Sequence, residues 1–307
     1  MSQQVRSIVP ANVDNIDKLM TALLNKNVRE YSPIHTRLFK KQTTTRKFER
    51  TVTVAPYGDV PEKPEGEEYA TDLIQQAYTK DVTNLEYGLM AEIPETAEED
   101  DLENILSQRS KFLTFSMHQV QEKRAADVFE NGFTTQTTAD AVALFSTAHT
   151  LKRGGTAKNR PSSDADLSTT SLAQGFIDLD TDTKLESGHL VMPAKGYYLL
   201  VAPANRFNAI KIVKSVKDPD SGNNAMNPLS DLDITVVVNP FLDTDTDAWY
   251  LVPKDKSANG LVYQERKAIT IQPPRTDPRT GNRLYPLRAR FVFDAVDWRN
   301  TYGSVGA

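Results

Sequence analysis

TAEEDDLENILSQRSKFLTFSMHQVQEKRAADVFENG, residues 96–132, is the stretch on which the arrangement of this chain depends. Its apolar residues return at helical spacing, through Leu102, Ile105, Leu106, Phe112, Leu113, Val120, Val128 and Phe129. Thr96 and Glu99 have the spacing of a capping box, and Asn131-Gly132 predicts a left-handed stop. About 34 residues at 1.5 Å each make a rod of roughly 50 Å. Such a rod is long for an enzyme of this size.

The residues before this helix do not resemble a domain that folds alone. Residues 12–28 predict a short amphipathic helix, whereas residues 31–45 carry no sustained period. Two strands are predicted at 48–54 and 85–93, where apolar and polar residues alternate. Between them, Pro56–Glu68 holds three prolines, two glycines and five acidic residues, which predicts the exposed tip of a long hairpin. An isolated ribbon is marginal in water, so this region needs the rest of the chain or neighbouring copies to lie on.

Residues 165–255 predict a compact α+β unit. A helix is expected to begin near Ser168 or Thr170, and a buried strand to cover 197–201. Pro203 is expected to open a second helix, because proline is tolerated in a first turn. The predicted buried face of that helix carries Phe207, Ile210 and Val213, and two further strands are expected at 234–238 and 248–252.

The C-terminal part returns to extended structure. Residues 261–272 and 284–295 predict two strands joined by PPRTDPRTGNR. In the second strand the apolar residues share one face and alternate with charged ones; they are Tyr285, Leu287, Ala289, Phe291, Phe293 and Ala295. One face of this ribbon is therefore expected to pack, while the other meets solvent or a partner.

Composition restricts the possible classes of protein. The 307 residues are 39% hydrophobic and 25% charged, which suits a globular chain rather than a disordered one. The absence of cysteine excludes disulfides and thiolate metal sites. The N-terminus MSQQVRSIVPANVD lacks the pattern of a signal peptide, so the chain is expected to stay where it is made. A net charge of -5 argues against histone-like wrapping of nucleic acid.

Ser146 and His149, with Asp140 upstream, suggest a serine hydrolase. However, the G-x-S-x-G elbow is missing, and a triad depends on spatial geometry that spacing alone cannot supply. A turn in which His149 makes local hydrogen bonds is therefore the preferred interpretation, and no catalytic residue is predicted.

Three other patterns resemble ligand sites. Arg153–Lys158 has the residue types of a phosphate loop without their order, so a surface loop is preferred. Asp243, Asp245 and Asp247 lack the glycine and glutamate of a calcium loop, so a solvated turn is preferred. The four histidines (His35, His118, His149 and His189) have no zinc spacing. No cofactor and no metal are predicted.

Basic residues gather in two places. The first group lies near the N-terminus and the second in the C-terminal ribbon; they are Lys40, Lys41, Arg46, Lys47 and Arg50, and Arg275, Arg279, Arg283, Arg288 and Arg290. A solvated face is the preferred interpretation. The functional alternative is that these residues pair with acidic surfaces of neighbouring copies, such as the 62–68 loop or the start of the long helix.

Three segments resemble the major head subunit of Mu-type phages. They are ALFSTAHTLKRGGTAKNRP at 143–161, GYYLLVAPANRFNAIKIVKS at 196–215 and LDITVVVNPFLDTDTDAWYLV at 232–252. The order of the predicted elements is similar to the Hong Kong 97-type capsid fold of tailed bacteriophages. The resemblance in amino-acid sequence covers residues 143–252. The resemblance in the order of the elements covers the whole chain.

The resemblance implies an α+β capsid subunit divided into four parts. These are an N-terminal arm at 1–45, an extended loop at 46–94, a peripheral domain at 95–164 and 256–307, and an axial domain at 165–255. It also implies hexamers and pentamers in an icosahedral shell around double-stranded DNA, located in the virion after assembly in the host cytoplasm. No membrane is expected, and scaffolding, portal and decoration functions are expected to belong to separate proteins.

Two rival functions stay open. An encapsulin-like nanocompartment would share the fold and carry enzyme cargo. A soluble hydrolase would use Ser146 and His149. Lys63 and Lys80 lie in or near the extended loop, where some members of this fold crosslink a lysine, but nothing in the sequence marks either as reactive.

Overall fold

The computed structural model describes residues 33–94, 105–217, 226–273 and 275–307. The helix expected at 12–28 and the capping box at Thr96 lie outside the described residues. Within them, helix α4 covers Ile105–Glu130 and is followed by a 3-10 turn, η2, at Asn131–Phe133. The long helix is therefore present over its described length.

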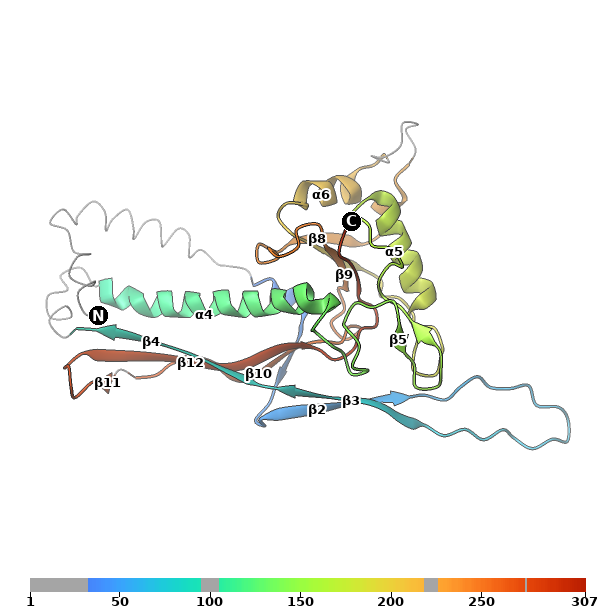
Figure 1. Cartoon of the computed structure of the whole chain (residues 1–307), viewed down its shortest axis with the longest axis horizontal. Helices are drawn as coiled ribbons and strands as arrows, with labels where there is room; N and C mark the ends of the chain where they lie inside the picture. The colour runs from blue at the N-terminus through green and yellow to red at the C-terminus, as the bar shows by residue number, and fades with distance from the viewer. Residues whose placement is uncertain (1–32, 95–104, 218–225, 274) are drawn as a thin grey trace. The chain divides into compact units, whose positions relative to one another are not determined.

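A five-stranded sheet runs beside α4 (Figure 1). Its strands are β1 (Lys40–Thr43), β10 (Leu261–Ile271), β12 (Arg283–Ala295), β11 (Arg275–Thr276) and β4 (Leu85–Ile93). Strand β12 pairs antiparallel with β10, β11 and β4, and β1 pairs parallel with β10. The short helix α2 (His35–Leu38) precedes β1. Part of the aperiodic 31–45 stretch is thus built into the sheet, because strand pairing holds it there.

The alternation in β12 is confirmed. Leu287, Ala289, Phe291 and Phe293 are buried and join one core cluster with Leu113, Met117 and Phe129 of α4. Burial of such a continuous apolar face is what stabilises a sheet against a helix. The long helix and the C-terminal ribbon therefore share one hydrophobic core.

The expected strand at 85–93 exists, but it is not the second strand of the hairpin. β2 (Phe48–Ala55) pairs antiparallel with β3 (Gln75–Thr83), whereas β4 leaves the hairpin and pairs with β12. The ring of Tyr87 stacks on Phe291, with centroids 4.5 Å apart. Periodicity identifies a strand but not its partner, and Tyr87 and Ala91 of β4 pack against the core to which β12 belongs.

The left-handed stop expected at Gly132 is wrong. Gly132 is not among the glycines with positive φ, and the chain continues into η2. A Cβ on Gly132 would lie 2.7 Å from Cδ2 of Phe145. This glycine is therefore needed for close approach of an aromatic ring rather than for a left-handed turn.

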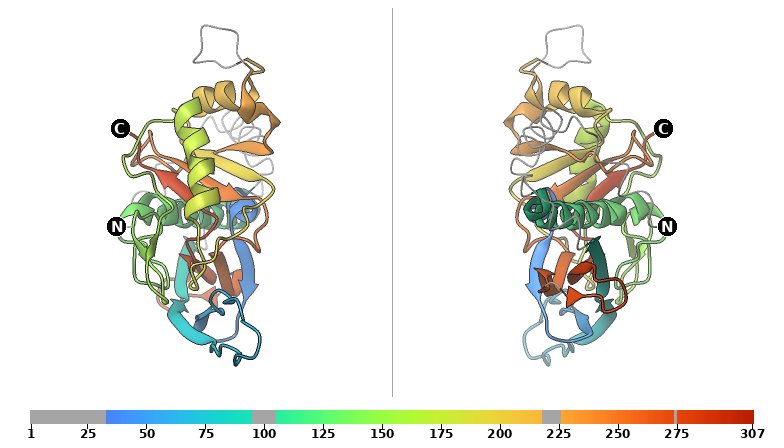
Figure 2. Two further views of the ribbon diagram at one scale, coloured as in Figure 1. Left: turned by 90° about the vertical axis from the view of Figure 1, so that its right-hand side faces the viewer. Right: turned by 90° about the vertical axis from the view of Figure 1, so that its left-hand side faces the viewer.

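A four-stranded sheet forms the second centre of the fold (Figure 2). Its order is β13 (Tyr302–Ser304), β9 (Trp249–Pro253), β7 (Tyr197–Val201) and β8 (Ile234–Val238). Helices α5 (Thr169–Asp182) and α6 (Arg206–Lys214) contribute to the core on one face, and residues of the α4 core cover the other. A sheet buried on both faces explains why β7 and β9 are apolar runs without alternation.

The helices of this unit start close to where they were expected, but one buried face differs. Ser168 caps α5 through a reciprocal capping box with Ser171. Helix α6 begins at Arg206, three residues after Pro203, and buries Ala209, Ile212 and Val213. Phe207 is 79% exposed, so its assignment to the buried face is wrong. Spacing defines two neighbouring helix faces, and packing against β7 and β8 selects between them.

Candidate assembly interface

The extended hairpin, defined here as β2, the loop 56–74 and β3, turns one side toward the rest of the chain. Val82 is 2% exposed and packs with Val262 and Val296. The other side is open, because Phe48, Val52 and Val54 are 45%, 44% and 52% exposed. Strand alternation separates these two sets of side chains. The hairpin therefore offers an apolar row that is not used by its own core.

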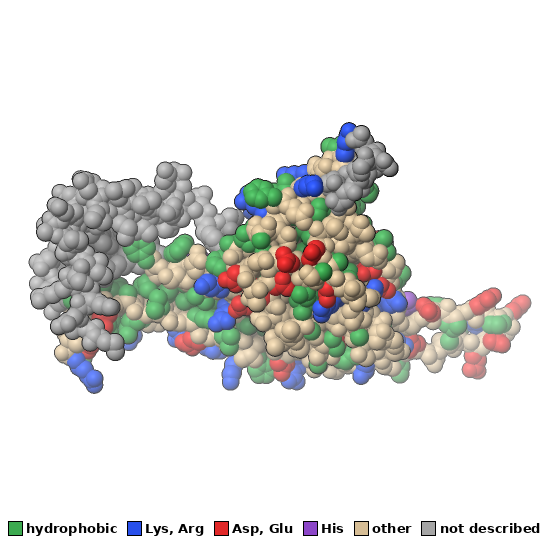
Figure 3. All heavy atoms as spheres, turned by 45° about the horizontal axis from the view of Figure 1, so that its top comes forward, with side chains coloured by type: hydrophobic (Ala, Val, Ile, Leu, Met, Phe, Trp, Pro, Cys, Tyr) green, Lys and Arg blue, Asp and Glu red, His purple; other side chains and the backbone are tan. Residues whose placement is uncertain are grey.

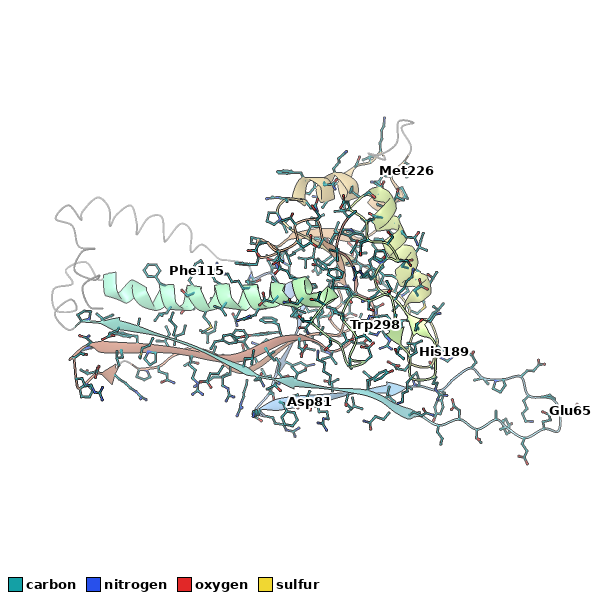
Figure 4. All side chains as sticks on the ribbon, in the orientation of Figure 1. Glu65, Asp81, Phe115, His189, Met226 and Trp298 are labelled. Atoms are coloured by element: carbon teal, nitrogen blue, oxygen red, sulfur yellow. The ribbon has the colours of Figure 1, made fainter. Side chains whose placement is uncertain are left out.

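The loop at the end of the hairpin is both acidic and apolar at its surface. Figure 4 places Glu65 at the far end, and Figure 3 shows acidic and hydrophobic side chains along the loop. Val60, Tyr69 and Leu73 are 94%, 82% and 76% exposed. Its acidic residues are Asp59, Glu62, Glu65, Glu67, Glu68 and Asp72, against one lysine, Lys63. Exposed apolar side chains beside charged ones are typical of a protein-protein contact.

Charged contacts hold the base of this loop. Arg153 bonds Asp72 at 2.9 Å and donates to the carbonyl of Leu73 at 2.9 Å. Hydrogen bonds from the Gly58 amide and the Arg153 guanidinium lower the pKa of Asp72 to about 2. His189 contacts Asp59 at 2.8 Å. The ends of the loop are therefore tied down while its middle extends outward.

Lys80 links β3 to the C-terminal end of β12 in the five-stranded sheet. Its ammonium contacts Asp294 Oδ1 at 2.6 Å and the carbonyl oxygen of Ala295 at 2.8 Å, and it also donates to the carbonyl of Thr137. The side chains of Lys80 and Asp294 are each 15% exposed. Lys63, by contrast, lies over the ring of Tyr69 in the loop, with its ammonium 4.8 Å from the centroid.

The structure brings Asp140 and His149 together but does not connect them to Ser146 as a triad. His149 Nδ1 lies 2.7 Å from Asp140 Oδ2, and Nε2 lies 3.1 Å from Asn159 Oδ1. The Ser146 hydroxyl accepts from the Ala148 amide at 3.2 Å. His149 is 0% exposed, and its ring stacks on Trp298 with centroids 4.2 Å apart. With both ring nitrogens directed at other groups, His149 is not placed to take a proton from Ser146.

Asn159 organises this buried cluster, and the sequence did not single it out. Its Nδ2 donates to the carbonyl of Leu144 at 2.7 Å, and its Oδ1 accepts from the Ser146 amide at 2.9 Å. Its backbone carbonyl accepts from Gly303 at 3.1 Å. Asn159 therefore joins the 143–161 segment to β13, and spacing carries no signal of such a role.

The remaining suspected ligand sites are turns. Arg153–Lys158 includes the turn between β5 (His149–Thr150) and β6 (Thr156–Ala157), where Gly154 and Gly155 have positive φ. In the 243–247 turn, Glu130 of α4 accepts from the amides of Asp243 and Thr244 at 2.8 and 2.9 Å. Among the described residues, no group of three or more histidine or acidic side chains could hold a metal ion.

Several basic residues of the two groups have acidic partners within the chain. Lys41 pairs with Glu265, Arg50 with Asp81, and Arg288 and Arg290 with Glu86. Arg275, Arg279 and Arg283 are exposed in or beside the turn that joins β11 to β12. Among the described residues of the C-terminal group, Arg275 and Arg279 are therefore positioned as an outward basic surface.

Two buried pairs of polar side chains were also not predicted from the sequence. His35 contacts Glu122 at 2.6 Å, with side chains 7% and 1% exposed. Arg299 contacts Glu186 at 2.8 Å, with side chains 9% and 5% exposed. Each pair joins residues far apart along the chain, so no local pattern could have shown it. Both act inside the core and offer nothing to a ligand.

Residues 77–303 match the family model described as phage capsid protein. The chain belongs to this phage capsid protein family. This capsid protein has no match among curated protein sequences. Within its described residues, none of its helices is long and apolar enough to cross a membrane.

Solved capsid structures share the fold of this capsid protein at low sequence identity. The capsid of cyanophage P-SCSP1u aligns with a TM-score of 0.61 at 10% identity, covering 90% of this chain and 88% of the other. The mature capsid of bacteriophage PhiM1 gives 0.58 at 10%, covering 89% and 87%. A virus-like particle from Pyrococcus furiosus gives 0.51 at 9%, covering 94% and 98%.

These comparisons confirm the expected Hong Kong 97-type α+β fold. They also confirm the expected role as a major capsid protein, the structural subunit of an icosahedral shell. The capsid protein is a structural protein of the virion.

Proposed function

We propose that this capsid protein builds the head of a tailed phage around double-stranded DNA, with the extended hairpin of each copy lying over the next copy. The open row Phe48, Val52 and Val54 and the exposed loop beyond it carry the proposal. A two-stranded ribbon with such a surface is marginal in water. A neighbouring copy would bury it, and closed symmetry would repeat the contact throughout the shell.

Charge suggests where the loop of one copy meets the next. The acidic loop and the turn carrying Arg275, Arg279 and Arg283 lie at opposite ends of Figure 1. Opposite charges at opposite ends favour head-to-tail association, which closes into rings when the rotation permits. The loop is therefore proposed to lie near the basic turn of a neighbouring copy.

The subunit is proposed to consist of the four parts expected from the sequence. Residues 1–45 form an arm, 46–94 the extended loop, 95–164 and 256–307 a peripheral domain, and 165–255 an axial domain around the capsomer axes. Hexamers and pentamers of these subunits would assemble in the host cytoplasm. Separate scaffolding, portal and decoration proteins would complete the head.

The proposed function includes no catalytic step and no cofactor. His149 is buried and directed at Asp140 and Asn159, which favours a packing role over hydrolysis. A net charge of -5 suits a container whose lining must not bind an entering genome tightly.

Electron microscopy of the protein assembled with its natural partners tests the proposal. Uniform icosahedral particles are expected, and nuclease-protected double-stranded DNA is expected inside native particles. Particles that hold an enzyme and no genome would instead support the nanocompartment alternative. A compact monomer under every condition, with hydrolysis lost in Ser146→Ala, would support the hydrolase.

A further inference from the structure

One anchor of the extended hairpin is an ammonium group bound by three oxygens. Lys80 lies in β3, two residues before the buried Val82. It reaches Asp294 and Ala295 at the end of β12 and Thr137 in the loop after α4. An ammonium has three hydrogens to donate, and all three acceptors here come from elements outside the hairpin.

This arrangement makes the contact directional. Val82 holds this end of the hairpin by apolar packing, which is non-directional. The other hydrogen bonds to the hairpin lie nearer the loop, at Tyr78 and at the loop ends. Hydrogen bonds to three acceptors on two segments define the angle at which β3 crosses the end of β12. Because Lys80 is 15% exposed, water competes weakly for its hydrogens.

We infer that Lys80 is a positioning residue that sets the direction in which the extended hairpin leaves the subunit before assembly. The inference rests on the proposed function only in saying why that direction matters, since a hairpin held in advance loses less entropy when it contacts the next copy. The engaged ammonium is also not available as a nucleophile for crosslinking.

Lys80→Met tests the anchor in the full-length subunit, with Lys63→Met as the matched control. Methionine keeps most of the apolar stem and removes the charge. Asp294 Oδ1 retains donors in Gln136 at 2.5 Å and in the amide of Ala295 at 2.8 Å, so the fold should persist. Lys63 carries the same side chain in the loop, where its ammonium lies over the exposed Tyr69 ring.

Hydrogen exchange of the unassembled subunit distinguishes a local loosening of the hairpin from a general loss of stability. Amides of β2 and β3 should exchange about tenfold faster in Lys80→Met, as expected for losing a charge-assisted bond, while those of α4 and β7 stay unchanged. Lys63→Met should leave all of them unchanged. Asp294→Asn should also speed exchange in the hairpin, and the double variant should add little, because the two groups act through one contact.

Shell formation is measured in a separate experiment, so that the anchoring role of Lys80 and the role of the hairpin in assembly can be contradicted independently. If Lys80 anchors the hairpin for assembly, Lys80→Met should slow shell formation although the subunit stays folded. Unchanged exchange in β2 and β3 would overturn the anchor. Faster exchange with normal assembly would overturn the link between hairpin direction and assembly. Loss of protection in every element would show that Lys80 serves the global fold, which also contradicts a positioning role.

Discussion

At the scale of single residues, the buried Asp140–His149 pair joins the loop after α4 to the 143–161 segment. Burial by itself raises the pKa of Asp140, but hydrogen bonds from His149 and Thr138 outweigh it, and the pKa is lowered from 3.8. A lowered pKa in the folded state means that the carboxylate contributes stability above pH ~4. That contribution is lost as the pH falls toward the folded-state value.

Asp140→Asn should therefore lower the free energy of unfolding at pH 7 by about 2 kcal/mol, because a charge-assisted hydrogen bond becomes a neutral one. The difference from the wild type should shrink in urea titrations below pH 4. Asp81→Asn, which breaks an exposed pair with Arg50, serves as control and should have little effect at either pH. An equal loss of stability at pH 7 and pH 3 would contradict this account of the pair.

Gly260 is a second residue whose role depends on close packing. A Cβ at this position would lie 2.3 Å from both the backbone nitrogen and the backbone oxygen of Asp297. Gly260→Ala should destabilise the subunit by about 2–3 kcal/mol, because backbone cannot move aside as a side chain end can. Gly88→Ala, where the nearest atom is 3.5 Å away, should change stability by less than about 0.5 kcal/mol. Chemical denaturation of the two variants gives the comparison.

At the scale of elements, the extended hairpin combines a fixed base with a free end. Replacing residues 60–70 by a short turn keeps Asp59 and Asp72, whose contacts with His189 and Arg153 hold the base. Circular dichroism and the melting temperature of the isolated subunit should change little, since Val60 and Tyr69 are exposed. Shell yield should fall sharply, because one contact is removed at every copy. A shortened subunit that no longer folds would place the loop in the internal core.

A charge-only variant separates shape from electrostatics in the same element. Glutamine at the four glutamates of the loop, Glu62, Glu65, Glu67 and Glu68, preserves its length and removes four of its six negative charges. If the acidic loop meets a basic turn, this variant should assemble more slowly than the wild type but more readily than the deletion.

At the scale of the whole molecule, the shell should respond to salt only in part. Raising the ionic strength from 0.15 to 1 M shortens the screening length from about 8 to about 3 Å. Contacts between the acidic loop and basic residues should weaken, while burial of Phe48, Val52 and Val54 should not. Light scattering of assembled shells should therefore show a modest loss that levels off. Complete dissociation by salt alone would mean that the apolar row makes no contact.

Much of the architecture could be predicted because it depends on neighbours in sequence. The spacing of Leu113, Val120 and Val128 defines one face of α4, and the alternation through Phe291 and Phe293 defines one face of β12. Ser168 marks the start of α5, because its side chain accepts a hydrogen bond from the amide of Ser171. The composition of the acidic, proline-rich loop predicts that it is exposed, since it has too little apolar material for a core.

What only the tertiary structure decided is which elements meet. β4 pairs with β12 rather than with β2, and Phe207 is exposed although it shares the spacing of a buried residue. Lys80 and Asp294 are 214 residues apart, and Asn159 joins segments that no local pattern connects. The periodicity of a segment predicts which side chains share a face of that helix or strand. The choice of partner depends on competing burial and hydrogen bonding across the whole chain, and that choice is made only when the chain folds.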